Sequence, residues 1–159
     1  MMYFEKEFKQ QQLFNIEQNK KAEFNAEFQS GDMNYWNRTI NELNVHAKGA
    51  GLESAMNQRL LAYLSLAFYS ISNQFINQNQ SDQAGYFVTL YKKADPTNSE
   101  AWYFSAVLHA RNNNANAAIN DLRKAVDNGF KDKQRLQQQP EFKTMQPPLN
   151  FEEIEAGMR

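Results

Sequence analysis

Few side chains in this 159-residue chain could bind a metal or perform acid–base chemistry. Cysteine is absent, which excludes disulfides, thiolate ligands and cysteine nucleophiles, and His46 and His109 are the only histidines. Neither histidine has a neighbouring histidine or acid in an arrangement suited to metal binding. We therefore expect no metal and no cofactor. His109 is predicted to pack between helices, and His46 to be a favourable positive charge at a helix end.

Known catalytic motifs are also missing from the sequence. No serine stands in a G-x-S-x-G turn, and no G-x-x-x-x-G-K-[ST] segment could cradle a phosphate. Three neighbouring acids, Glu152, Glu153 and Glu155, fall in the first turns of a predicted helix, where the helix dipole accounts for them. Since no nucleophile, base and oxyanion donor can be combined, we do not expect an enzyme.

The charge balance argues against a nucleic-acid partner. The chain has 17 basic and 18 acidic residues and a net charge of -1, so no overall field attracts polyanions. A basic cluster at residues 123–135 is interrupted by Asp127 and Asp132. No apolar run approaches the roughly 18 residues that a membrane span needs. We expect a soluble protein, cytoplasmic, or periplasmic if a leader has been removed.

The hydrophobic pattern predicts an all-α chain. Hydrophobic residues make up 42% of the sequence and recur at spacings of three and four, with only six glycines and four prolines. Six helices are predicted: Glu5 to Gln29, Asp32 to His46, Glu53 to Asn77, Asp82 to Ala94, Ser99 to Asn112, and a helix capped by Asn114 that ends at Asn128. Short turns would join them as antiparallel hairpins.

The first helix carries a phenylalanine-rich stripe. Its predicted buried positions are Phe8, Leu13, Ile16, Phe24 and Phe28. The same stripe would suit a partner-binding amphipathic helix, but packing against the next helix is the simpler prediction, because apolar stripes at helical spacing are usually core.

Residues 130–159 follow a different pattern. The segment KDKQRLQQQPEF can make one or two short turns, and Pro147 with Pro148 prevents a helix there. Asn150 and Glu153 then form a capping-box-like pair that starts a final helix. The apolar residues of that helix share one face: Phe151, Ile154 and Met158. We expect it to dock on the preceding hairpin and to cap the fold.

One segment, Asp95 to Gly129, carries a specific pattern. After Pro96, large and small residues stand at the spacings of a helix hairpin. They are Trp102, Ala106, Ala118, Leu122 and Ala125. The pattern resembles a tetratricopeptide repeat, a pair of helices about 34 residues long with an early large residue, small residues at the helix crossing and a proline at the boundary. His109 departs from it, where the family usually has Tyr.

The resemblance implies a short α-solenoid of stacked hairpins in one domain, residues 1–159. The hairpins would span about residues 5–47, 53–94 and 98–129, with a capping tail at 130–159. In the first of them, Trp36 stands where the repeat has a small residue, and extra residues around Asn77 lengthen the second. The ending GF followed by PEF is similar to tails that follow the last such repeat in bacterial proteins.

In the family that the chain resembles, the first helix of each hairpin lines a concave binding wall. On the last hairpin the implied wall residues are Glu100, Tyr103, Val107, Ala110 and Arg111. By the same register the first hairpin would offer Gln18, Lys21, Asn25 and Phe28. Tyr and Arg often anchor interfaces, although packing of Tyr103 on the preceding hairpin is an equal alternative. Glu100 and Phe104 stand where chaperone-binding members need cations, so no chaperone-tail adaptor is expected.

The resemblance therefore implies a non-catalytic scaffold or adaptor that binds a protein or peptide of unknown identity in its concave groove. One alternative is a ligand-binding helical domain of a bacterial envelope protein, whose aromatic and amide side chains hold a glycan or a small polar molecule. Another is a self-assembling structural module that forms a homo-oligomer.

Overall fold

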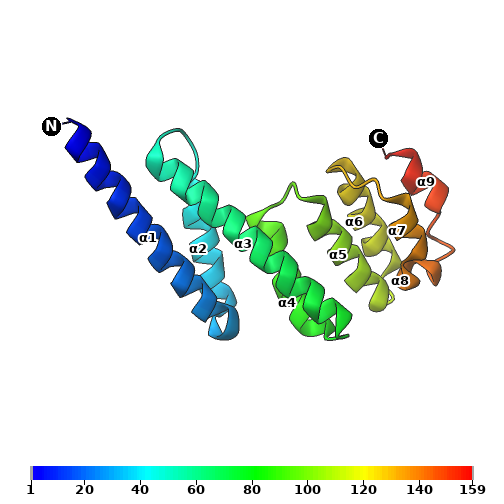
Figure 1. Cartoon of the computed structure of the whole chain (residues 1–159). Coiled ribbons are helices and arrows are strands. Elements are labelled where there is room, and N and C mark those ends of the chain that lie inside the picture. The colour runs from blue at the N-terminus through cyan, green and yellow to red at the C-terminus, as the bar shows by residue number, and fades with distance from the viewer. Residues whose placement is uncertain (1, 159) are drawn as a thin grey trace. The chain divides into compact units, whose positions relative to one another are not determined.

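A computed structural model of the chain describes residues 2–158, which fold as nine helices without any strand. This confirms the all-α prediction, and adjacent helices pack in pairs (Figure 1). The helices are α1 (Met2–Ser30), α2 (Met33–His46), α3 (Leu52–Asn77), α4 (Ser81–Ala94), α5 (Ser99–Arg111), α6 (Ala115–Asp127), α7 (Lys133–Gln138), α8 (Pro140–Lys143) and α9 (Phe151–Ala156).

The chain divides into two compact units, and the boundary lies inside α3. Unit 1 extends to Ala67 and contains α1, α2 and the first part of α3, whereas unit 2 begins at Phe68 and contains the rest. Helix α3 has 26 residues and extends about 39 Å at 1.5 Å per residue, so it is long enough to contribute to both units.

Side-chain caps begin several of the helices. Asp32 Oδ1 accepts a hydrogen bond from the backbone N–H of Tyr35 at 2.7 Å, and Asn114 Oδ1 accepts one from Ala117 at 3.2 Å. Asn98 and Asn150 cap α5 and α9 in the same way. These bonds satisfy backbone N–H groups that have no partner within the helix.

The core of unit 1 is aromatic. Trp36 of α2 is completely buried, and its ring centroid lies 5.9 Å from that of Phe24 and 5.3 Å from that of Phe28, against which it stacks. Ile40 and Leu60 are also completely buried. The large Trp36 therefore occupies space that a small residue would leave empty in a pair of helices lined by phenylalanines.

Two residues of the predicted buried stripe are exposed. Leu13 and Phe24 are buried, but Phe8 is 66% exposed and Ile16 is 43% exposed. The prediction for Phe8 and Ile16 was wrong. Ile16 directly precedes the buried Glu17 and faces a different side of α1. Phe8 is exposed because α1 has 29 residues and α2 has only 14. The first turns of α1 extend beyond the helix that covers the rest of it (Figure 1).

In unit 2, small residues let α5 and α6 approach closely. Ala106, Ala118 and Ala125 are completely buried where the two helices meet. After α6, Gly129 adopts a φ of 104°, which favours glycine, and Phe130 N–H donates to the carbonyl of Ala125 at 2.9 Å. The chain is thereby turned back toward α5.

Candidate functional site

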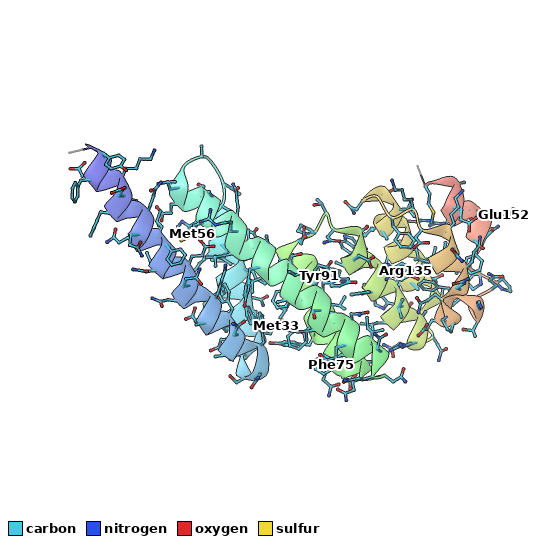
Figure 2. All side chains as sticks on the ribbon, in the orientation of Figure 1. Met33, Met56, Phe75, Tyr91, Arg135 and Glu152 are labelled. Carbon is cyan, nitrogen blue, oxygen red and sulfur yellow. The ribbon has the colours of Figure 1, made fainter. Side chains whose placement is uncertain are left out.

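The predicted wall of α5 lies beneath the C-terminal tail of the chain. Tyr103 is 1% exposed, and its ring stacks on Phe130 at 4.7 Å and meets Phe142 edge-on at 5.6 Å, between ring centroids. Its hydroxyl donates a hydrogen bond to Gln139 Oε1 at 2.9 Å. The guanidinium carbon of Arg135 (Figure 2) lies 4.2 Å from the ring centroid of Tyr103. Burial raises the pKa of the Tyr103 phenol.

The two charged residues of this wall are paired with the tail. Glu100 accepts a hydrogen bond from Arg135, and Arg111 Nε–H donates to Glu141 Oε2 at 2.7 Å. Burial alone would raise the pKa of the Glu141 carboxyl, but hydrogen bonds from Gln139 and Arg111 outweigh it and hold that pKa below its ordinary value. Both ends of the wall are therefore fixed to the tail by charged groups.

The prediction of an open binding wall on α5 is corrected. It was made for Glu100, Tyr103, Val107, Ala110 and Arg111. Glu100, Tyr103 and Arg111 instead form hydrogen bonds with the tail, and Val107 and Ala110 are 2% and 7% exposed. Phe142 of the tail is completely buried, so covering the wall removes apolar surface from water.

A buried polar cluster joins α5 to α6. The Ser105 hydroxyl donates to Asp121 Oδ2 at 2.5 Å and accepts a hydrogen bond from Lys92 Nζ at 3.1 Å. His109 Nε2 lies 3.5 Å from the same carboxylate oxygen. In a hydrolytic triad the serine hydroxyl would bond to the imidazole, whereas here it bonds to the carboxylate and Ser105 is 4% exposed. The geometry is that of a polar contact between helices.

Lys21 and Asn25, predicted on the first hairpin, lie together beside α3 in unit 1. Asn25 Oδ1 accepts a hydrogen bond from the Tyr63 hydroxyl at 2.5 Å, and Lys21 Nζ lies 5.3 Å from the centroid of the Tyr63 ring. Lys21 also lies 3.5 Å from a carboxylate oxygen of Glu17. Sequence reasoning missed Tyr63 and Glu17 because their partners lie on another helix: Tyr63 and Asn25 are 38 positions apart, and Glu17 and Arg59 are 42 positions apart.

Glu17 and Arg59 form the centre of this surface. Glu17 is 6% exposed, and Arg59 donates to both of its oxygens, from Nε at 3.1 Å and from Nη2 at 2.7 Å. The hydrogen bonds and the charge of Arg59 hold the pKa of Glu17 below its ordinary value, although burial opposes this. The side chain of Arg59 is itself 56% exposed, so its orientation is fixed while part of it faces solvent.

An exposed leucine stands next to these charges. Leu66, two turns after Arg59 on α3, is 70% exposed. We name the surface formed by six residues the α1–α3 strip: Glu17, Lys21, Asn25, Arg59, Tyr63 and Leu66. Two cations and one carboxylate leave it with an excess positive charge. Such a surface is suited to hold a carboxylate by charge-assisted hydrogen bonds beside an apolar side chain.

Other kinds of site find no support in residues 2–158. No group of three or more metal-ligating side chains there could hold a metal ion, and none of the described helices combines the length and the apolar character that crossing a membrane requires. Comparison of the chain with protein-family models, curated proteins and solved structures finds no match.

Proposed function

We propose that this chain is a non-catalytic interaction module, organised like a tetratricopeptide-repeat protein, that binds a segment of another protein on the α1–α3 strip. The observation that carries the proposal is the state of Arg59. Its guanidinium is oriented by Glu17, yet its side chain remains 56% exposed. An oriented arginine loses little conformational freedom when it binds a further group, which is one reason why arginine often anchors interfaces.

The neighbours of Arg59 indicate the chemistry of the partner. Lys21 adds a second cation, and Leu66 adds an apolar side chain that is 70% exposed. The Asn25 amide accepts a hydrogen bond from Tyr63 and retains N–H donors for a backbone carbonyl. The partner is therefore an acidic segment that also carries an apolar side chain, and its binding weakens as salt screens the charges.

The glycan alternative has less support from the aromatic side chains. Sugars stack on exposed aromatic faces, but Trp36 is completely buried and Tyr91 and Tyr103 are each 1% exposed. Trp102 is covered in part by two cations, with Lys92 Nζ and Lys124 Nζ at 5.2 and 4.6 Å from its ring centroid. Among the other exposed rings, Phe4, Phe8 and Phe14 lack the hydrogen-bonding groups that hold a sugar, and Tyr69 stacks on Phe104 with ring centroids 5.5 Å apart. Tyr3 is exposed and has a hydroxyl.

The experiment that tests the proposal begins with selection of peptides from a random display library by the wild-type chain. The affinity of the selected peptides is then measured by fluorescence anisotropy for wild type, Leu66→Asp and Val45→Asp. Val45 is the matched control, since it is 62% exposed but belongs to α2. We expect acidic and apolar peptides, with Leu66→Asp weakening binding at least about tenfold and Val45→Asp leaving it within about twofold.

Two outcomes would contradict the proposal. One is the selection of peptides without acidic residues, or of none at all. The other is equal weakening by both variants, each shown by circular dichroism to be folded, because the binding surface would then lie elsewhere.

A further inference from the structure

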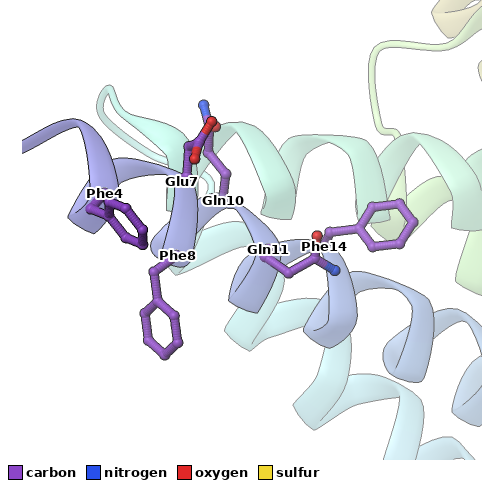
Figure 3. Close-up of a pocket in the computed structure, with 6 residues that line it drawn as sticks. All are labelled: Phe4, Glu7, Phe8, Gln10, Gln11 and Phe14. Carbon is purple, nitrogen blue, oxygen red and sulfur yellow. The ribbon is translucent and has the colours of Figure 1, made fainter.

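The first turns of α1 expose four aromatic side chains. Tyr3, Phe4, Phe8 and Phe14 are 72, 76, 66 and 56% exposed, respectively. Figure 3 shows the rings of Phe4 and Phe8 projecting away from the other helices of unit 1 and that of Phe14 projecting to a different side of α1. Four exposed rings within four turns form an unusually apolar surface for a helix that is otherwise rich in Gln, Asn and charged residues.

Glu7 and Gln11 lie between these rings along the helix. The spacing of the six residues, at intervals of one, three and four, spreads them over one broad side of α1, with Phe8 and Phe14 near its opposite edges. We name this set the N-terminal aromatic face: Tyr3, Phe4, Glu7, Phe8, Gln11 and Phe14. From the typical area of aromatic side chains, its four rings expose about 500 Å².

We propose that the N-terminal aromatic face binds the same face of a second copy of the chain. The two α1 helices run antiparallel, with the two-fold axis level with Lys9. Complete burial of these rings in both copies would remove about 1,000 Å² in total from solvent, which is close to the smallest area of a specific interface. The dimer is therefore weak.

The order of residues along the face is complementary to itself in this orientation. A two-fold contact is reciprocal, so that residues equally far from the axis are brought level with each other. Phe4 then lies level with Phe14 of the second copy. Glu7 lies level with Gln11 of the second copy, whose amide is a donor for the carboxylate. A parallel pair would instead put Glu7 against its own counterpart, and like charges repel.

A cleft next to Phe14 is available for one of the incoming rings. It has a volume of about 200 Å³, large enough for one aromatic side chain, and lies between α1 and the start of α3. Its lining residues are Gln10, Leu13, Phe14, Glu17, Leu52 and Arg59. In the antiparallel pair, the side chains level with Phe14 are Phe4 and Tyr3 of the second copy. The exposed ring of Phe4 and the cleft beside Phe14 therefore lie at equal distances along α1 from the two-fold axis.

Sedimentation velocity tests the dimer. From about 1 to 300 µM, wild type should rise in mass from the 18.5 kDa of one chain toward twice that value. Phe4→Asp/Phe8→Asp should remain at 18.5 kDa. The control is Ile16→Asp, a residue of the same helix that is 43% exposed and lies outside the face, and it should dimerise like wild type. A wild type that stays monomeric, or a Phe4→Asp/Phe8→Asp variant that dimerises equally, would overturn the proposal.

Disulfide trapping tests the orientation, and the absence of natural cysteine makes each introduced thiol the only one in its chain. Glu7→Cys and Gln11→Cys chains are mixed, distinguished by a tag, and oxidised. The antiparallel pair predicts mixed disulfides in excess of either homodimer. Predominance of Glu7→Cys homodimers would overturn it.

Different variants test the dimer and the proposed peptide site, so that either proposal can be contradicted without the other. Glu17 and Arg59 line both the cleft and the α1–α3 strip, but Leu66 does not line the cleft. Leu66→Asp should therefore weaken peptide binding at least about tenfold and leave the mass of the dimer unchanged. Phe4→Asp/Phe8→Asp should remain monomeric and bind the selected peptides like wild type.

Discussion

Arg59 of α3 binds both carboxylate oxygens of Glu17 in α1, with Nε at 3.1 Å and Nη2 at 2.7 Å, across a separation of 42 residues in sequence. The carboxylate is buried, whereas the side chain of Arg59 is 56% exposed. The pair therefore fixes α1 against α3 and at the same time presents part of a cation to solvent. Its removal should affect stability and binding together.

Replacement of Glu17 by Gln should destabilise unit 1. The neutral amide keeps one acceptor but loses the charge-assisted pair with Arg59, and we expect a loss of about 1–2 kcal/mol in the free energy of unfolding. Urea denaturation followed by circular dichroism measures it. The control is Glu23→Gln, because the pair of Glu23 with Lys20 is 3.8 Å long and about half exposed; its loss should cost less than about 0.5 kcal/mol. Equal effects of the two variants would show that burial of Glu17 is unimportant.

In wild type, low pH should remove the stabilisation that the pair of Glu17 and Arg59 provides. The pKa of Glu17 in the fold lies below its ordinary value of 4.5, so the pair stabilises the fold above that value and is lost as the pH falls through the folded-state pKa. The difference in free energy of unfolding between wild type and Glu17→Gln should thus be constant near neutral pH and shrink below pH 4.5. Urea titrations over this pH range test it, and a difference that does not change with pH would contradict the assignment.

Replacement of Phe142 by Ala should release the tail from α5. Phe142 is completely buried and contacts Tyr103, so the cavity should cost about 3–5 kcal/mol. Hydrogen–deuterium exchange should become faster in peptides from α5 and α7 and remain unchanged in α1 and α2, which belong to the other unit. Gln138→Ala, at an exposed position of α7, serves as the control. Unchanged exchange in α5 would mean that Phe142 does not hold the tail.

Two glycine-to-alanine substitutions should change stability in opposite directions. Gly129 has a φ of 104°, a conformation that strains any residue with a Cβ, so Gly129→Ala should destabilise by about 1–2 kcal/mol. Gly85 lies inside α4, where an added Cβ would meet no neighbouring atom within 4 Å, and Gly85→Ala should stabilise by about 0.5–1 kcal/mol. Thermal unfolding of both variants tests whether Gly129→Ala lowers the melting temperature and Gly85→Ala raises it.

Local sequence was sufficient to predict the helices and their ends. Asn98 and Asn114 cap the helices that follow them, and Gly129 ends the last long one, because a cap needs only its own backbone and the next few residues. The buried alanines of α5 and α6 were also predictable, since these helices are neighbours in sequence and their small residues recur at helical spacing.

The surfaces available for binding depended on contacts between residues far apart in sequence. Tyr103 has the type and spacing of a wall residue, yet the tail that buries it begins 27 positions later with Phe130. Phe8 continues an apolar stripe, but the helix that would cover it is too short to reach it. Helix formation is governed by interactions over a few residues, whereas exposure depends on which distant segment packs against a face and on how far that segment extends.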